Sequence, residues 1–440
     1  MRCGVWAICV VAALGYAADR ARAQPGPPVR DLQPIAGDPF SNPIFCPPAA
    51  DTKPGTLYDA VTAADPFAVP SPSDRLPQVS NRCVCEAGFT TWFTAEWLVG
   101  RTRGPTVSPI VTTGPASAGP LAGAVGQPAT LPLFGGRRVL NDWRSGLRVE
   151  TGIWFDDDRR TGLSARVYSL FSESDRFTAQ PAGAAVVNVP HFIPVGGAAV
   201  QIPVFVGFPG ITTGTVQTSA RTTFTGGDVN FRRLLDGGER YRVELLAGYR
   251  QLYLGDELGA SFVVVPAGQA AAVLPRLTGS DAVRSRDDFF GPQLGLCAST
   301  GWDRFTLEAH AATALGVTVS DLNFVRARTV SGNPASAATL LSAVGVPAPI
   351  AATLAAATNQ FPLAGTNTGG SVTYFGVVGE GGLRVNWRAT DHLRLTGGYS
   401  FLYWNNVRRA QEAFASSALL HPRAADFTTH LFSVGLDVRY

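Results

Sequence analysis

The chain has 440 residues, of which 45% are hydrophobic and 16% are charged, and its formal net charge is +3 at pH 7. A charge this close to neutral predicts no nucleic-acid or other polyanionic partner. The 48 glycines and 32 prolines indicate many turns and little helix.

Residues 1–23 have the pattern of a secretory signal peptide. Arg2 precedes an apolar run from Cys3 to Leu14, and a small-residue cleavage site, Ala21-Arg22-Ala23, follows. That run is too short for a transmembrane helix, and no later segment offers about 18 uninterrupted apolar residues. The mature chain is therefore expected to be either soluble or a membrane β-barrel.

Residues 24–86 are rich in proline, alanine, aspartate and glycine and show no regular period, which predicts an extended periplasmic linker. The spacing Cys83-x-Cys85 is too short for a zinc hook, so no metal or other cofactor is expected. In an oxidising compartment Cys46 could pair with Cys83 or with Cys85, and the sequence leaves both pairings open.

From Phe89 onward, apolar and polar residues alternate in repeated segments. A period of two is typical of a strand with one apolar and one polar face. The sequence predicts ten such strands, at residues 91–99, 146–155, 162–171, 220–233, 241–254, 289–298, 305–317, 374–387, 393–404 and 430–440. Twelve strands remain an alternative if a hairpin at Ala260–Val265 reaches membrane depth.

The predicted connections alternate strictly between short and long. The short turns are Asp156–Arg160, Leu235–Glu239, Thr300–Arg304 and Arg388–His392. The long loops are 102–144, 172–218, 255–285, 319–372 and 405–426. This alternation is typical of an antiparallel up-and-down transmembrane β-barrel, which must close because lipid offers no partner for a free edge. Residues 87–440 are thus predicted to form a barrel in the lipid bilayer of the outer membrane, with both termini in the periplasm.

The last strand carries an apolar register of Phe432, Val434, Leu436, Val438 and Tyr440, and the sequence ends on this aromatic residue. It resembles the final strand of bacterial outer-membrane barrels. That resemblance implies recognition of Tyr440 by the barrel-assembly machinery.

Short motifs follow the strands in a fixed order, at residues 93–98, 228–232, 246–254, 290–296, 375–380 and 398–404. With these motifs the chain resembles the β-barrel porin 7 family, outer-membrane proteins known mainly from Planctomycetes. Gly379 and Ala410 depart from the family pattern, which has proline at both places. The resemblance implies a pore.

The polar register of the strands faces inward and carries nearly balanced charge. It holds Glu96, Arg148, Glu150, Arg166, Asp228, Arg232, Arg242, Glu244, Arg250, Glu308, His310, Glu380, Arg384, Arg394, Asp437 and Arg439. One interpretation is a charged pore lining that selects small polar solutes. The other is a set of ion pairs that fills a narrow lumen, which the small strand count favours. A constricted pore is compatible with both.

Six aromatic residues fall in the outward register, several near strand ends: Trp97, Tyr241, Tyr249, Tyr399, Tyr403 and Tyr440. Their positions predict aromatic girdles at the membrane interfaces.

No catalytic constellation is apparent in the sequence. Glu308-x-His310 offers only two ligands or catalytic groups, and Asp156-Asp157-Asp158 has the position of a solvated turn. Motifs of serine hydrolases, zinc proteases and nucleotide-binding proteins are missing, so the protein is predicted not to be an enzyme. Cys297 lies in a strand and is interpreted as a small apolar residue.

Two long loops are apolar, at residues 184–208 and 337–358, and the second predicts an alanine-rich helix interrupted by Gly345, Pro347 and Pro349. Such stretches could constrict the mouth, meet a partner or pack on each other, and mutual packing is favoured. The functional hypothesis is a passive channel for small polar solutes with a partly filled lumen. Its alternative is a non-conducting surface scaffold whose loops contact the envelope or other cells. The sequence does not decide the oligomeric state.

Overall fold

The computed structural model describes residues 90–195, 198–331, 337–343, 345–359, 366–411 and 424–440. The predicted signal peptide, the predicted linker and Cys46, Cys83 and Cys85 lie outside these residues. The described elements are β1 (Thr90–Thr102), β2 (Val111–Pro115), η2 (Ala116–Leu121), β3 (Leu131–Phe134), β4 (Trp143–Trp154), β5 (Thr161–Ala179), β6 (Ala185–Val195), β7 (Ala198–Gly207), β8 (Thr212–Gly237), β9 (Tyr241–Pro266), η3 (Gly268–Ala272), β10 (Arg276–Trp302), β11 (Phe305–Ser331), α2 (Ala337–Ala343), α3 (Ala348–Asn359), β12 (Thr366–Arg388), β13 (Leu393–Val407) and β14 (Ala425–Arg439).

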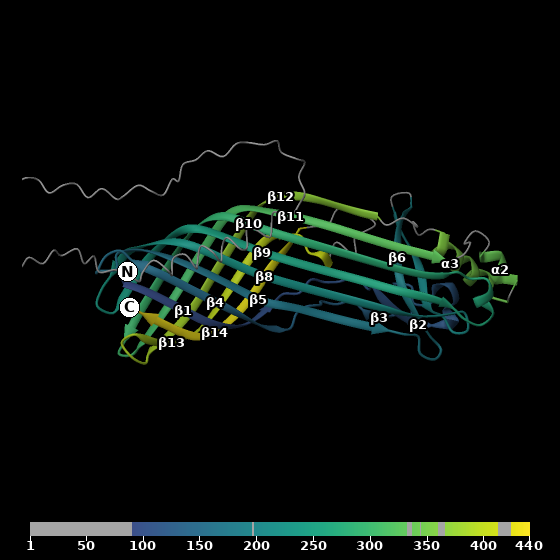
Figure 1. Cartoon of the computed structure of the whole chain (residues 1–440), viewed down its shortest axis with the longest axis horizontal. Helices are drawn as coiled ribbons and strands as arrows, with labels where there is room; N and C mark the ends of the chain where they lie inside the picture. Colours follow the sequence, from purple (N-terminus) through teal and green to yellow (C-terminus); the bar gives the residue numbers. More distant parts are fainter. Residues whose placement is uncertain (1–89, 196–197, 332–336, 344, 360–365, 412–423) are drawn as a thin grey trace, which may run out of the picture. The chain divides into compact units, whose positions relative to one another are not determined.

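Ten strands close into an antiparallel barrel in the order β1-β4-β5-β8-β9-β10-β11-β12-β13-β14 (Figure 1). The last strand pairs with the first, from Trp92 opposite Arg439 to Thr102 opposite Thr429. At the seam, the Tyr440 amide donates to the Thr91 carbonyl, and the Thr91 amide donates to the Tyr440 carbonyl. The predicted closed, up-and-down, ten-stranded barrel is confirmed.

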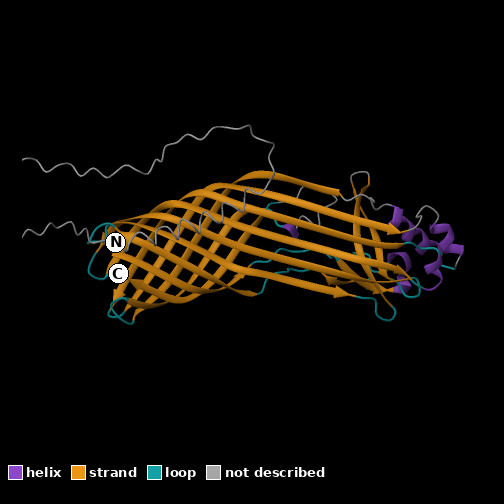
Figure 2. Cartoon of the chain, viewed as in Figure 1, coloured by secondary structure: helices purple, strands orange, loops and turns teal. Residues whose placement is uncertain are grey.

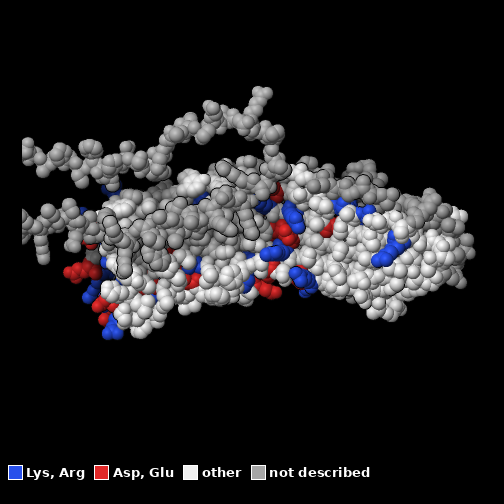
Figure 3. Space-filling model, in the orientation of Figure 1, with Lys and Arg blue, Asp and Glu red and all other residues white. Residues whose placement is uncertain are grey.

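An apolar band surrounds the barrel next to its short turns. On β14, Phe432, Val434, Leu436 and Tyr440 are exposed and face outward. The stretch from Phe432 to Tyr440 matches the length of about 9–11 residues that a tilted strand needs to cross a bilayer. Charged side chains gather at the short-turn end and again midway along the unit, and few lie between (Figure 3).

Six strands continue beyond this band, where the sequence predicted long loops. These continuations, here called the extension, are residues 172–179, 212–222, 255–266, 276–288, 319–331 and 366–377. The long-loop predictions are therefore wrong at 172–179, 212–218, 255–266, 276–285, 319–331 and 366–372, whereas residues 220–222 and 374–377 are strand, as predicted. The twelve-strand alternative, with a hairpin at Ala260–Val265, is also wrong, because those residues lie near the C-terminal end of β9, paired with β10.

In the extension, the polarity of the two strand faces is reversed, so that the inward face is apolar and the outward face is polar. On β10, Arg284 and Arg286 point outward, whereas Val283 and Leu277 are buried inside. Beyond the apolar band, a sheet is expected to pack as it does in a soluble protein. Its apolar side then faces inward and its charged side faces water. Outward apolar residues are fewer there, with Val265, Val325 and Val372 among them, so the pattern of a membrane strand is interrupted and the sequence predicts loops.

A four-stranded sheet, β3-β2-β6-β7, packs against the inner face of the extension. Val204 and Val206 of β7 share one apolar core with Val216, Leu258 and Phe262 of β8 and β9. We call this sheet, together with α2 and α3, the platform. Helices lie at the end opposite the short turns (Figure 2).

The two apolar loops pack on each other, as predicted. Leu341 of α2 and Ile350 of α3 share a buried cluster with Val186 and Phe205 of the β6–β7 hairpin. The predicted alanine-rich helix is confirmed as two helices, α2 and α3, and Gly345 between them adopts a φ of 84°. None of the described helices has the length and hydrophobicity to cross a membrane.

Replacing Phe205 by alanine is expected to release the helices of the platform. Phe205 is 1% exposed and lies 5.3 Å from the ring of Phe208. Its truncation should remove about 3–5 kcal/mol of packing. Protease should then cut faster within α2 and α3, while heat-modifiable migration of the barrel on a gel is retained. The matched control is Phe171→Ala, which removes an exposed ring from the outer face of β5. An unchanged cleavage pattern would contradict the packing role of Phe205.

Candidate functional site in the barrel lumen

The inward register of seven strands gathers ionisable side chains in the middle of the lumen. Twelve of the residues predicted to line the pore lie in this lumen cluster, buried or nearly so: Glu96, Arg148, Glu150, Arg166, Asp228, Arg232, Glu244, Arg250, Glu308, His310, Glu380 and Arg384. Period-two alternation placed each side chain on this face.

Ion pairs join opposite walls of the barrel. Arg166 on β5 and Glu380 on β12 lie five strands apart in the ring of ten. Arg166 Nη1 donates to Glu380 Oε1 at 2.7 Å, and Arg166 Nη2 donates to Asp228 at 2.7 Å. Arg250 on β9 also pairs with Glu380. Side chains that meet across the lumen leave it filled at this level.

A second group completes the filling around Glu96. Arg148 pairs with Glu96 and donates to Ser433 Oγ at 3.0 Å. Arg384 lies 3.3 Å from Glu96 and donates to Glu150 Oε2 at 3.1 Å, again across the lumen. The arginine forks suit such pairs because one guanidinium binds two carboxylates.

The chemistry available in the lumen cluster is limited by these pairs. His310 Nε2 lies 3.3 Å from Glu380, whose carboxylate is already held by two arginines. A cavity of about 40 Å³ remains beside Glu150, Arg166 and Glu308, a volume that suits ordered water. Within the described part of the chain, no group of three or more His, Cys, Asp or Glu residues could hold a metal ion.

An apolar layer lies above the lumen cluster, and nine of the ten strands contribute to it. Ring pairs cross the lumen, with Phe224 on β8 4.8 Å from Phe427 on β14, and Phe289 on β10 6.1 Å from Trp404 on β13. All four rings are fully buried. The layer consists of Leu98, Tyr168, Leu170, Phe224, Leu252, Leu254, Phe289, Ala314, Val378, Leu402, Trp404, Val407, Phe427 and Leu431.

A polar layer above these rings was missed in the sequence. Arg409 pairs with Asp256, and the Arg408 amide donates to Asp287 Oδ1 at 3.0 Å. Asp256 and Asp287 belong to the stretch 255–285 and its border, which had been assigned to a loop. Alternation that runs on from the predicted strands, through residues 255–262 after Leu254 and through residues 281–288 before Phe289, is the signal in the sequence that points to them.

Asp287 gives the polar layer a pH dependence. Its neighbours Arg286 and Asp288 form an outward ion pair at 2.7 Å, which places this level beyond the apolar band. Burial raises the pKa of Asp287 from an ordinary 3.8 to about 7, with Asp256 adding to the rise and Arg409 opposing it.

A pH series is expected to separate Asp287→Asn from the unchanged protein. Because the folded state disfavours ionised Asp287, the wild type should lose stability as pH rises from about 4 to about 7 and regain it as pH falls. The free energy of unfolding of Asp287→Asn relative to wild type should therefore grow by about 4 kcal/mol over that window. Urea unfolding at several pH values measures it, with Asp157→Asn on an exposed turn as the control. Parallel pH profiles of Asp287→Asn and wild type would contradict the prediction.

The remaining predicted lining residues lie at the short-turn end rather than in the lumen cluster. Arg439 Nε donates to Asp437 at 3.0 Å, and Arg242 pairs with Glu244 and stacks 4.9 Å from the ring of Trp154. Arg394 is half-buried next to them, opposite Asp437.

The predicted girdle residues lie on the outer surface. Trp97, Tyr241, Tyr249, Tyr399 and Tyr440 are exposed, and Tyr403 is half-exposed. Cys297 is buried on the inner face of β10 and has no disulfide partner among the residues that the structure describes.

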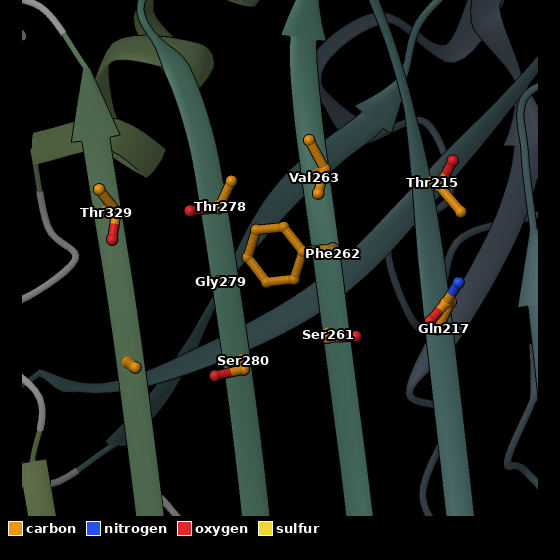
Figure 4. Close-up of a pocket in the computed structure, with 10 residues that line it drawn as sticks. Thr215, Gln217, Ser261, Phe262, Val263, Thr278, Gly279, Ser280 and Thr329 are labelled. Carbon is orange, nitrogen blue, oxygen red and sulfur yellow. The ribbon is translucent and has the colours of Figure 1, made fainter.

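The extension has an open cavity of about 360 Å³ on its surface. Small polar side chains of four neighbouring strands line it, as Figure 4 shows for Thr215, Gln217, Ser261, Thr278 and Ser280.

The sequence matches one protein family, described as "Putative beta barrel porin-7", over residues 92–419. This match covers well over half of the chain. The chain belongs to the porin-7 family. The resemblance found in the strand motifs is thereby confirmed, and membership together with the closed barrel makes this an outer-membrane β-barrel protein that lies in the lipid bilayer. No curated protein matches the sequence.

Solved outer-membrane barrels resemble this porin-7 protein only distantly. The Escherichia coli outer membrane protease OmpT is 10% identical with a TM-score of 0.40, covering 80% of this chain and 96% of its own. The translocator domain of the Neisseria meningitidis autotransporter NalP is 9% identical, with a TM-score of 0.20, and covers 80% and 88%. An anion-selective porin from Comamonas acidovorans is 10% identical, with a TM-score of 0.17, and covers 80% and 100%. These TM-scores are too low to support any inference about function.

Proposed function

We propose that this porin-7 protein is a non-conducting outer-membrane barrel that carries the platform as a surface for contacts with the envelope or with other cells. The observation that carries the proposal is the apolar layer. Its rings meet across the lumen and exclude water, and the lumen cluster fills the space below. Core positions filled by side chains are expected for barrels of about this size.

The proposal includes an orientation. The short turns and both termini lie in the periplasm, the platform lies outside, and the barrel-assembly machinery recognises the strand that ends at Tyr440. Residues 1–23 act as a signal peptide, and residues 24–86 act as a periplasmic linker. The exposed aromatic residues act as girdles at the two interfaces.

Planar-bilayer recording tests whether the barrel conducts. We expect no channel steps from folded protein, identified by heat-modifiable migration. Regular steps from the same preparation would overturn the non-conducting role. Replacing Ala185–Gly207 by a short turn should abolish binding to envelope fractions or cells while the barrel stays folded, and unchanged binding would overturn the contact role.

A passive channel for small polar solutes is the second candidate, favoured by the porin family to which the chain belongs. Conduction would require the apolar layer to open, since Phe224 and Phe427 now meet across the lumen. The lining residues of the lumen cluster would then select solutes by charge. The same recordings distinguish the two functions.

We also infer that the protein is not an enzyme. In its best-placed acid–base pair, His310 and Glu380, the carboxylate of Glu380 also forms ion pairs with two buried arginines inside the barrel. A catalytic site needs a reacting atom within reach of such a pair, and the 40 Å³ cavity beside it leaves no room for a substrate. Turnover of a peptide or ester substrate by the purified barrel, abolished by His310→Gln, would contradict this inference.

A further inference from the structure

Five arginines surround the opening of the barrel at the short-turn end. We call Arg159, Arg242, Arg388, Arg394 and Arg439 the arginine mouth. Arg388 on β12 lies directly opposite Arg394 on β13, and Arg394 lies opposite Asp437 on β14. The side chain of Arg242 donates to the carbonyl of Arg159. Like charges placed opposite each other on neighbouring strands are destabilising unless something compensates them.

The carboxylates in this region pair with only two members of the arginine mouth, Arg439 and Arg242. Asp437 pairs with Arg439, and Glu244 is shared between Arg232 and Arg242. Arg159, Arg388 and Arg394 form no ion pair within the described residues. The Nε atom of Arg394 is buried and has no hydrogen-bond partner there either.

The acidic residues on the adjacent turns are engaged elsewhere or point to solvent. Asp156 accepts from the Thr161 hydroxyl at 2.6 Å, and Asp236 accepts from the Tyr241 hydroxyl at 3.1 Å. Asp158 pairs with Arg160 in an exposed bridge, and Asp157, Glu239, Asp303 and Asp391 are exposed to solvent on the turns. Among the inward-facing side chains at this opening, the five arginines therefore outnumber the carboxylates, in contrast to the nearly neutral lumen cluster.

Two further features shape the site. Trp92 and Trp154 stack at 5.2 Å, Arg232 of the lumen cluster lies over both rings, and Arg242 of the mouth lies over Trp154, so this ring pair, the aromatic floor, marks where the mouth meets the lumen cluster. Burial, together with repulsion from Arg439 and Arg242, lowers the pKa of Arg159. A negative ligand between these groups would relieve the repulsion.

We propose that the arginine mouth binds a small oxyanion, a phosphate or a carboxylate, between the guanidinium groups of Arg159, Arg394 and Arg439. Planar guanidinium forks bind the oxygens of both anions in pairs. A cleft lined by one sign of charge also raises the local concentration of the opposite ion. The site does not depend on whether the barrel conducts, because its arginines lie at the short-turn end, outside the apolar layer that would have to open.

Calorimetric titration of the full-length protein with inorganic phosphate, in uncharged detergent at low ionic strength, tests the proposal. One saturable site is expected. Removing two charge-assisted contacts in the double variant Arg159→Gln/Arg394→Gln should weaken phosphate binding about tenfold or more. The matched control is Arg284→Gln, which removes an exposed arginine from the outer face of the extension and should leave the affinity unchanged.

Competition by acetate separates the two ligand classes. Displacement of phosphate by acetate assigns a general oxyanion site, and resistance to acetate assigns a phosphate site. Heat-modifiable migration establishes that each variant is folded. The proposal is overturned if phosphate shows no saturable binding, or if the double variant and Arg284→Gln bind phosphate as the wild type does.

Discussion

Replacing Glu380 by glutamine is expected to lower the free energy of unfolding by about 3–5 kcal/mol, because it leaves buried arginines without their counter-charge. Glu380 is held by Arg166 at 2.7 Å, by Arg250 and by His310 at 3.3 Å. The side chain of Arg250 is 0% exposed, so water cannot replace the lost carboxylate. The midpoint of urea unfolding, followed by the change in gel migration, measures the loss.

Glu257→Gln is the matched control for this experiment. Glu257 pairs with Arg284 at 3.1 Å on the outer face of the extension, where both side chains are more than half exposed. Loss of an exposed pair should cost below about 1 kcal/mol. Equal midpoints for the two variants would show that the cross-lumen pairs do not hold the barrel together.

The ion pairs of the lumen show which features of the site can be predicted from alternation in the sequence and which cannot. A period of two identifies Arg166 and Glu380 as inward residues on separate strands. It cannot identify them as partners, because they are 214 positions apart and meet only when the ring closes with ten strands. Neighbouring strands are predictable from the short turns, whereas opposite walls depend on barrel diameter and strand stagger.

The extension shows why the sequence predicts loops at residues that form strands beyond the apolar band. On β9, Leu258, Ala260, Phe262 and Val264 form an apolar face that is directed inward. The outer face carries Glu257, Gly259 and Ser261 before Val263 and Val265, so its first part is the reverse of the pattern that lipid demands. An alternation test that ignores which face is apolar would have extended the strands and would have revealed Asp256 inside.

The apolar layer is expected to determine whether ions pass. Replacing Phe224 and Trp404 together by alanine should produce channel steps in planar bilayers from a barrel that is otherwise silent. Both rings are fully buried, each packs against Phe427, and the Trp404 indole donates to Thr318 at 3.0 Å. Truncation removes the contact across the lumen and should cost about 3–5 kcal/mol for each ring.

Trp143→Ala/Phe432→Ala is the control, since it removes the same two kinds of ring. These rings lie 5.8 Å apart on the outer face of β4 and β14, where both are about half exposed. Folded control protein should remain silent. If the double alanine variant in the lumen does not fold, Phe224→Leu/Trp404→Leu keeps the layer apolar while thinning it. If a folded lumen variant shows no channel steps, the apolar layer is not what blocks the barrel. The block would then be assigned to the ion pairs of the lumen cluster, because charged side chains that pair across a barrel can close it without aromatic rings.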